Sequence, residues 1–203
     1  MRVKDMFLKN EGFLLVLILT SCLFLSKNIQ SSSDNKDKII DYFSSLKFFS
    51  ASFVQSDGEN LSEGKVYIGE KRVRAEYFSP TKILIILDKD KAMYYDYELE
   101  EDEFFNPKNT NAWFFYDLFR NPYFLRDSFV KLKNNEIILE KKGFDNEQNN
   151  YLIKTYFENN PLVLRKIEVF INDNFLQLSI FDHEYNKEFD KSYFKLINPN
   201  LLN

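Results

Sequence analysis

The stretch from Ala51 to Leu99 constrains the fold more than any other part of the sequence. It contains short segments that alternate apolar and polar residues, separated by turn sequences. In such a segment Val73, Ala75 and Tyr77 project from one face of a strand, and the residues between them project from the other. A period of two with turns about every eight to twelve residues predicts an antiparallel β-meander and argues against alternating strands and helices.

The first 30 residues have the organisation of a secretory signal peptide. Basic residues precede an apolar run over residues 13–25, and a polar stretch follows. The run is shorter than a comfortable membrane span but fits the apolar core of a signal peptide. We therefore predict a signal peptide in residues 1–30 and one mature domain in residues 31–203, exported to the periplasm.

Cys22, the single cysteine, lies in this apolar run. The folded domain can therefore form no disulfide. Residues 19–22 are similar to the box of bacterial lipoproteins, in which the cysteine is lipidated, although the apolar run continues past Cys22. Three outcomes stay open: lipidation of Cys22 with membrane anchoring, cleavage after Cys22, and an uncleaved anchor.

The remaining pattern predicts a few helices among many strands. Asp34 or Asn35 can cap an amphipathic helix over residues 36–48. Asn111 can cap a helix that ends at Phe119, and a second short helix follows over residues 123–128. Strands resume afterwards, the last over residues 189–196. The prediction is a mainly β (α+β) domain, an incomplete antiparallel β-barrel of about 10–11 strands with an N-terminal helix and a short helical lid over an apolar cavity.

Several functional classes find no support in the composition. The net charge is −4 and no basic stripe is present, which argues against a nucleic-acid partner. His183, the only histidine, stands between two acidic residues, and no motif of a nucleophilic enzyme or a metal site occurs. We therefore predict that the protein is not an enzyme and holds no metal or cofactor.

Motifs along most of the mature chain resemble those of the LolA family, periplasmic carriers of outer-membrane lipoproteins. The order and spacing of these motifs support the resemblance more strongly than any single motif does. They are Ala51-Ser-Phe53-Val-Gln55, Gly64-Lys-Val66-Tyr-Ile68, Arg74-Ala-Glu76-Tyr77, Pro80, Ile85, Asp88, Tyr95-Asp96, Leu99, Ile167–Asn172, Phe175–Phe181, Phe194 and Pro199.

The resemblance implies a monomeric carrier with an unclosed barrel and an apolar cavity. The cavity would receive the acyl chains of outer-membrane lipoproteins from an inner-membrane lipoprotein-releasing ABC transporter. It would then deliver them to an outer-membrane acceptor or to the membrane itself. Two alternatives use the same fold: an outer-membrane-anchored acceptor similar to LolB, with Cys22 lipidated, and a lipid-sensing regulatory binding protein.

The candidate cavity residues follow from strand parity and from the apolar lid. An ordinary sheet–helix core would show the same pattern, so both interpretations stay open at each position. The candidates are Ala51, Phe53, Val66, Ile68, Val73, Ala75, Tyr77, Ile85 and Tyr95 on the strands, with Trp113, Phe114 and Leu118 on the lid.

One departure from the family concerns lid gating. Members usually carry Arg-Pro directly after the second strand, and that arginine helps to keep the unloaded lid closed. Here the positions are Gly69 and Glu70. Arg72 and Arg74 are the candidates to replace it. The Trp or Phe common at the position of Ala75 is also absent, which predicts a wider cavity there.

Overall fold

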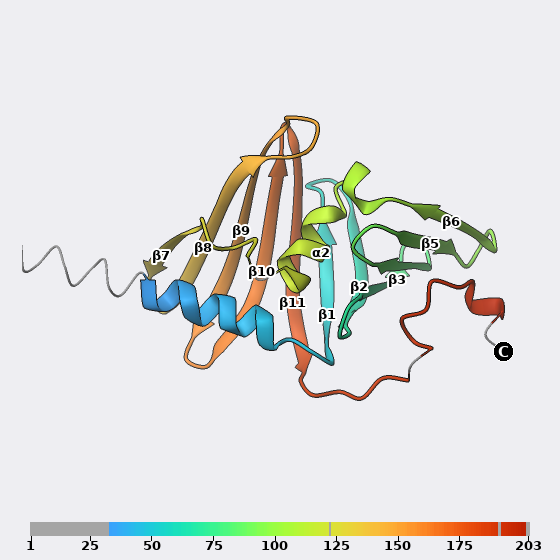
Figure 1. Ribbon diagram of the computed structural model, residues 1–203, viewed down its shortest axis with the longest axis horizontal. Coiled ribbons are helices and arrows are strands. Elements are labelled where there is room, and N and C mark those ends of the chain that lie inside the picture. Colours follow the sequence, from blue (N-terminus) through green and yellow to red (C-terminus); the bar gives the residue numbers. More distant parts are fainter. Residues whose placement is uncertain (1–32, 122, 191, 202–203) are drawn as a thin grey trace, which may run out of the picture.

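The computed structural model describes residues 33–121, 123–190 and 192–201. Among these residues, eleven strands form one sheet in the order β6-β5-β4-β3-β2-β1-β11-β10-β9-β8-β7 (Figure 1). The strands are β1 (Phe49–Ser56), β2 (Leu61–Ile68), β3 (Val73–Ser79), β4 (Ile83–Leu87), β5 (Ala92–Asp96), β6 (Glu101–Phe105), β7 (Phe129–Lys133), β8 (Glu136–Phe144), β9 (Asn150–Asn159), β10 (Leu162–Ile171) and β11 (Asn174–Glu184).

The sheet consists of two antiparallel meanders joined at one seam. Strands β1 to β6 form the first meander and β7 to β11 the second, while β1 pairs with β11 between them. In the described sheet β6 and β7 are the two edges and do not pair with each other. The predicted mainly β architecture, an antiparallel barrel that does not close, is confirmed.

The connection from edge strand β6 to edge strand β7 crosses the concave face of the sheet (Figure 1). It includes a 3-10 helix, η1 (Pro107–Asn109), and the α-helix α2 (Trp113–Arg120). The predicted side-chain cap at Asn111 is wrong, because Ala112 occupies the cap position and makes no side-chain hydrogen bond there.

The predicted helix over residues 123–128 is also wrong. This segment forms successive turns, closed by bonds from Arg126 N to Tyr123 O and from Ser128 N to Leu125 O. Leu125 is its fully buried anchor, with 1% of its surface exposed. Phe124 also packs against the core, but two adjacent side chains do not provide the apolar stripe that stabilises a helix by packing.

Within the described residues the N-terminal helix covers residues 33–45, so it includes residues ahead of the predicted start at residue 36. Asp34 and Asn35 therefore lie inside the helix, and the prediction that one of them caps it is wrong. Phe43 packs this helix against α2 and the sheet, because its ring lies 5.7 Å from the rings of both Phe119 on α2 and Phe157 on β9. The helix ends early because the chain must reverse into β1, and Phe48 takes a left-handed φ of 56° at that bend.

The predicted strand over residues 189–196 is absent from the described part of that range, residues 189–190 and 192–196. This C-terminal segment instead runs back along the sheet toward β4 and β5 (Figure 1). Arg72 Nη1 donates to the Phe194 carbonyl at 2.8 Å, and Arg74 Nη1 donates to the Tyr193 carbonyl at 2.7 Å. The backbone N–H groups of Tyr193 and Lys195 donate to the carbonyls of Asp190 and Ser192, so they close turns and are not available for a strand ladder.

The C-terminal segment covers a second, smaller apolar cluster on the outer face of β4 and β5. Leu84, Ile86, Met93 and Tyr95 are each at most 1% exposed, and Leu196 of the segment packs against them. Asn200 Nδ2 also donates to the Tyr95 hydroxyl at 2.8 Å. This cluster explains why β4 is an uninterrupted apolar run, since both of its faces are covered.

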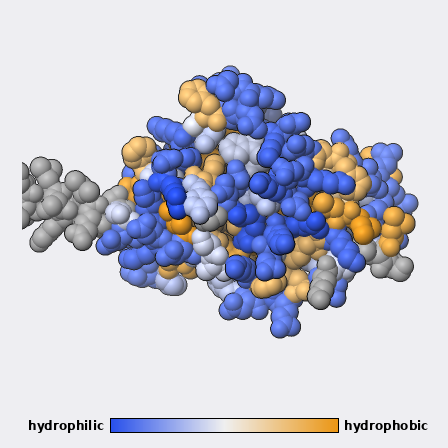
Figure 2. Space-filling view, viewed as in Figure 1, coloured by the Kyte–Doolittle hydropathy of each residue, from blue (hydrophilic) through white to orange (hydrophobic). Residues whose placement is uncertain are grey.

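The surface seen in Figure 2 is mostly hydrophilic, with hydrophobic side chains at the right, over β5 and β6. Leu99 and Phe104, which are 68% and 45% exposed, belong to this part of the chain. Within the described residues, no helix is both long and apolar enough to cross a lipid bilayer.

The contact between Gly69 and Phe194 allows a test of where the C-terminal segment lies. A Cβ atom on Gly69 would be 2.9 Å from Phe194 Cε2, closer than side chains tolerate. We expect Gly69→Ala to lower the free energy of unfolding by about 1 kcal/mol through this overlap. In a Phe194→Ala background the same change should cost close to nothing, which a double-mutant cycle by urea denaturation measures. Equal costs in both backgrounds would contradict this placement.

Candidate functional site

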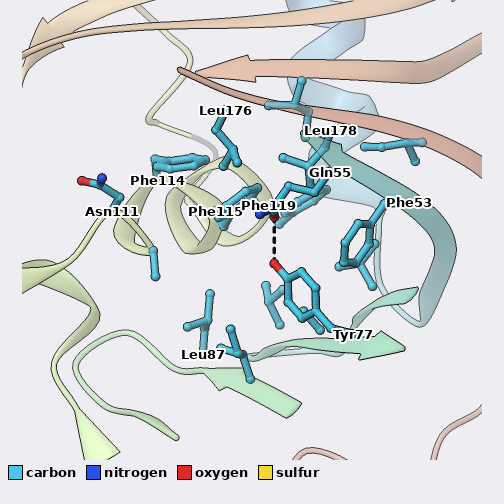
Figure 3. Close-up of a pocket in the computed structure, with 17 residues that line it drawn as sticks. Phe53, Gln55, Tyr77, Leu87, Asn111, Phe114, Phe115, Phe119, Leu176 and Leu178 are labelled. Atoms are coloured by element: carbon cyan, nitrogen blue, oxygen red, sulfur yellow. Dashed lines mark hydrogen bonds between the residues drawn. The ribbon is translucent and has the colours of Figure 1, made fainter. Parts of the chain in front are cut away.

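An apolar cavity of about 230 Å³ lies between α2 and the concave face of the sheet (Figure 3). Strands β1 to β4 form one wall, β10 and β11 form another, and α2 with the two residues before it closes the remaining side. The residues that line it are Phe53, Gln55, Val66, Val73, Ala75, Tyr77, Ile85, Leu87, Asn111, Ala112, Phe114, Phe115, Phe119, Ile167, Leu176, Leu178 and Ile180.

Most of the candidates taken from the first meander and the lid are in the wall of this cavity. The structure places seven of them there: Phe53, Val66, Val73, Ala75, Tyr77, Ile85 and Phe114. Ala51, Ile68 and Leu118 are at most 1% exposed but belong to the surrounding core and not to the cavity wall. For these three positions the ordinary-core interpretation applies.

Tyr95 and Trp113 do not line the cavity. Tyr95 pairs with Leu84 and shares the outer face with it, whereas Ile85 on the cavity side pairs with Tyr94. The face assigned to Tyr95 was therefore wrong. Trp113 turns toward the second meander, where its ring lies 5.3 Å from that of Tyr151.

The sequence reasoning missed a large part of the wall. The missed residues are Gln55, Leu87, Asn111, Ala112, Phe115, Phe119, Ile167, Leu176, Leu178 and Ile180. Alternation in β11 could have found Leu176, Leu178 and Ile180, since they follow the same period of two. Helical spacing of four residues could likewise have found Phe115 and Phe119.

Phe53 and Tyr77 form the aromatic part of the cavity wall. Gly64 lies between them in the sheet, paired with both. A Cβ atom on Gly64 would be 2.5 Å from Phe53 Cζ, so the glycine leaves room for that ring. The two rings meet edge to face, with 5.1 Å between their centroids.

Tyr77 also brings a hydroxyl to the otherwise apolar wall. Its hydroxyl donates to Gln55 Oε1 at 2.8 Å, the bond drawn in Figure 3. Burial raises the pKa of Tyr77 to about 12, so at neutral pH the group is a neutral hydrogen-bond donor.

The hydrogen bonds and ion pairs of Arg72 and Arg74 within the described residues go to partners other than α2, and their gating role stays a prediction. Arg72 Nε bonds Asp88 Oδ2 at 2.7 Å, and Arg74 Nε bonds Glu76 Oε1 at 2.7 Å. The Nη1 of each arginine donates to the C-terminal segment, as described above, and Arg74 Nη2 makes a second contact with Glu76. Both arginines therefore act on the outer face of the sheet.

Arg120, the last residue of α2, holds the lid helix against the rest of the fold. Its Nη1 donates to the carbonyls of Gly69 at 2.9 Å and Glu70 at 3.3 Å, and its Nη2 donates to the Leu46 carbonyl. Burial lowers the pKa of Arg120 to about 10, so the side chain stays charged at neutral pH. Arg120 thus links the lid helix to the turn between β2 and β3. Gly69 and Glu70 in that turn are the two positions where the family pattern has Arg-Pro.

His183 has a structural environment. Its Nε2 lies 2.7 Å from the Leu164 carbonyl, and its ring packs beside Phe49. Burial lowers its pKa, which keeps the ring neutral. Within the described ranges, no group of three or more His, Cys, Asp or Glu residues could hold a metal ion.

Solved structures are similar to this chain at very low sequence identity. An uncharacterized conserved protein from Thermus thermophilus is 8% identical with a TM-score of 0.54, over 82% of this chain and 95% of that chain. MucB in a complex with MucA from Pseudomonas aeruginosa is 8% identical with a TM-score of 0.47, over 79% of this chain and 59% of that chain. The likeness to the Thermus protein concerns the fold alone.

No curated protein gives a significant match to the sequence. Residues 44–197 match the family described as "Outer membrane lipoprotein carrier protein LolA". The match begins in the N-terminal helix, includes every strand and α2, and ends in the C-terminal segment. The chain therefore belongs to the LolA family of outer membrane lipoprotein carrier proteins.

Proposed function

We propose that this protein is a periplasmic carrier that takes up the acyl chains of lipoproteins and transfers them from the inner to the outer membrane. The observation that carries the proposal is the apolar cavity beneath α2. In this proposal an inner-membrane lipoprotein-releasing ABC transporter supplies the cargo. An outer-membrane acceptor, or that membrane itself, receives it.

The free energy of acyl hydration requires a cavity of this kind. Each methylene exposed to water costs about 0.8 kcal/mol, so a lipoprotein leaves a bilayer only if a protein covers its chains. The walls meet this need, because every lining residue except Gln55, Tyr77 and Asn111 has a purely hydrocarbon side chain. No charged residue is among the described residues that line the cavity.

In this proposal the structure represents the closed form of the carrier, because its cavity is small. At about 230 Å³ the cavity exceeds the roughly 150 Å³ that holds one benzene. It is smaller than the about 300–1,000 Å³ of pockets that enclose a whole drug-sized ligand. Loading of complete acyl chains therefore requires α2 to move away from the sheet, and Arg120 opposes that movement.

A charge inside the cavity tests the binding site. We expect Ala75→Glu to abolish binding of a fluorescent fatty-acid probe, because the carboxylate would face an apolar wall and an apolar ligand. Phe78→Glu is the matched control, since Phe78 is on the same strand but 52% exposed, and binding should be retained. Loss of binding in both variants would contradict the assignment of faces.

Filling the cavity provides a version of this test without a buried charge. Ala75→Leu adds apolar volume at the wall where Ala75 pairs with Val66 and Ile85. We expect the melting temperature to stay the same or rise while probe affinity falls at least tenfold. Unchanged affinity in a folded variant would place the ligand elsewhere.

The lid contact predicts a kinetic effect of Arg120→Met. The variant loses the hydrogen bonds to the Leu46, Gly69 and Glu70 carbonyls, and unfolding free energy should fall by about 1–3 kcal/mol. Stopped-flow fluorescence should show faster uptake of the acyl probe, because less free energy is needed to lift α2. Arg74→Met is the control, since it also removes bonds to a carbonyl but on the outer face; the same acceleration there would contradict a lid-specific role.

The cargo and the processing of the N-terminus can be read in one measurement. Native mass spectrometry of the protein from its own envelope fraction should find a soluble species that lacks residues 1–30 and carries a triacylated lipoprotein. A mature chain that begins at Cys22 with a diacylglyceryl group would instead identify the anchored acceptor. Cys22 lies outside the described residues, so this mass decides between the two.

A further inference from the structure

Gln55 is a polar exception in the cavity wall that the carrier function does not by itself explain. Its amide lies at the centre of the view in Figure 3, held by the hydroxyl of Tyr77. Because the Tyr77 hydroxyl occupies Gln55 Oε1, the amide oxygen is satisfied. The amide nitrogen remains, with two N–H groups to donate.

The Gln55 amide nitrogen has no hydrogen-bond partner in the part of the chain that the structure describes. Solvent reaches this nitrogen, because it is not one of the buried polar atoms that lack a partner. An acceptor on a ligand would take the place of water there and accept the same N–H groups. The orientation of the amide is also set in advance. Tyr77 is neutral at physiological pH and its ring is packed against Phe53, so the N–H groups keep their direction.

The polar residues gather at one end of the cavity. Gln55 is the next-to-last residue of β1, and Tyr77 pairs with Ile83 at that same end of the β3–β4 ladder. The opposite end of the ladder is the pair Val73 and Leu87, both lining the cavity and purely apolar. The cavity therefore has a polar end and an apolar end.

A groove of about 240 Å³ adjoins the polar end. It shares Asn111, Phe114 and Leu176 with the cavity and adds the polar side chains of Asp57 and Asn174. A ligand with an apolar chain and a polar head fits the cavity and the groove in one orientation only. The chain points toward the apolar end, and the head leaves past Asn111 and Asp57.

We propose that Gln55 recognises the carbonyl group of a fatty acyl ester or amide, with Tyr77 as the residue that positions it. The amide N–H groups donate to the acyl carbonyl, and the hydrocarbon chain extends from there into the apolar end. The site thereby distinguishes an acyl chain from a plain hydrocarbon or an alkyl ether. This inference rests on the proposed acyl-binding function and adds which group of the ligand the protein recognises, the carbonyl.

Two lipids that differ only in the carbonyl test the inference. Monolauroyl glycerol, an ester, and monododecyl glycerol, the matching ether, are each titrated against a bound fluorescent fatty-acid probe. We expect the wild-type protein to bind the ester about tenfold more tightly, the factor that one additional hydrogen bond provides. N-lauroyl ethanolamine, an amide, tests the second source of the carbonyl and should show the same preference over the ether.

Gln55→Leu should bind ester and ether equally well, because the donor is gone while the wall stays apolar. Tyr77→Phe keeps the amide but frees its oxygen, so the preference for the ester should fall below tenfold without disappearing. A thermal melt of each variant shows that it is folded. A preference that survives in Gln55→Leu would overturn the inference, because another group would then read the carbonyl.

The remaining outcomes separate this inference from the proposed function. Equal, measurable affinity of the wild-type protein for ester and ether would overturn carbonyl recognition and leave acyl binding intact. Binding of neither lipid, nor of the probe, would overturn both.

Discussion

The wide sheet has one concave apolar face, and the described residues form no second sheet to cover it. Strands β6 and β7 end the described sheet without pairing, so closure cannot bury this face. The N-terminal helix over residues 33–45 covers part of it, and α2 covers another part. Between α2 and strands β1 to β4 the side chains do not fill the space, and this incomplete packing is the cavity. The rest of the fold holds α2 in its position over the sheet.

The β2–β3 turn is one of the elements that hold α2, and it is contacted from two sides. Arg120 of the lid bonds the carbonyls of Gly69 and Glu70, while the ring of Phe194 from the C-terminal segment lies against Gly69. A larger residue at position 69 would collide with that ring. Gly69 therefore leaves room for the C-terminal segment, while Arg120 of the lid bonds to the same turn.

Much of the fold was predictable because strand alternation is a local property. The period of two identified the strands of both meanders and placed Val73, Ala75 and Tyr77 on one face, where the structure has them. Tyr95 failed because β4 and β5 are apolar on both faces, so alternation carried no information about which face is inside. The prediction of a strand over residues 189–196 was wrong because contacts with distant residues hold this segment. Its backbone carbonyls accept bonds from Arg72 and Arg74.

By itself the sequence determined the class of the fold, the strands of the two meanders and the family, because these depend on local periodicity and on motif order. Only the tertiary structure decided which apolar residues line a cavity and which fill a core. Ala51 and Ala75 have the same parity in the sheet, yet Ala51 is in the packed core and Ala75 faces the cavity. Alternation sets the side of a strand on which a residue lies. The distance to the opposite wall is set by where α2 is held, and Arg120 bonds to partners 50 and 74 residues away in the sequence.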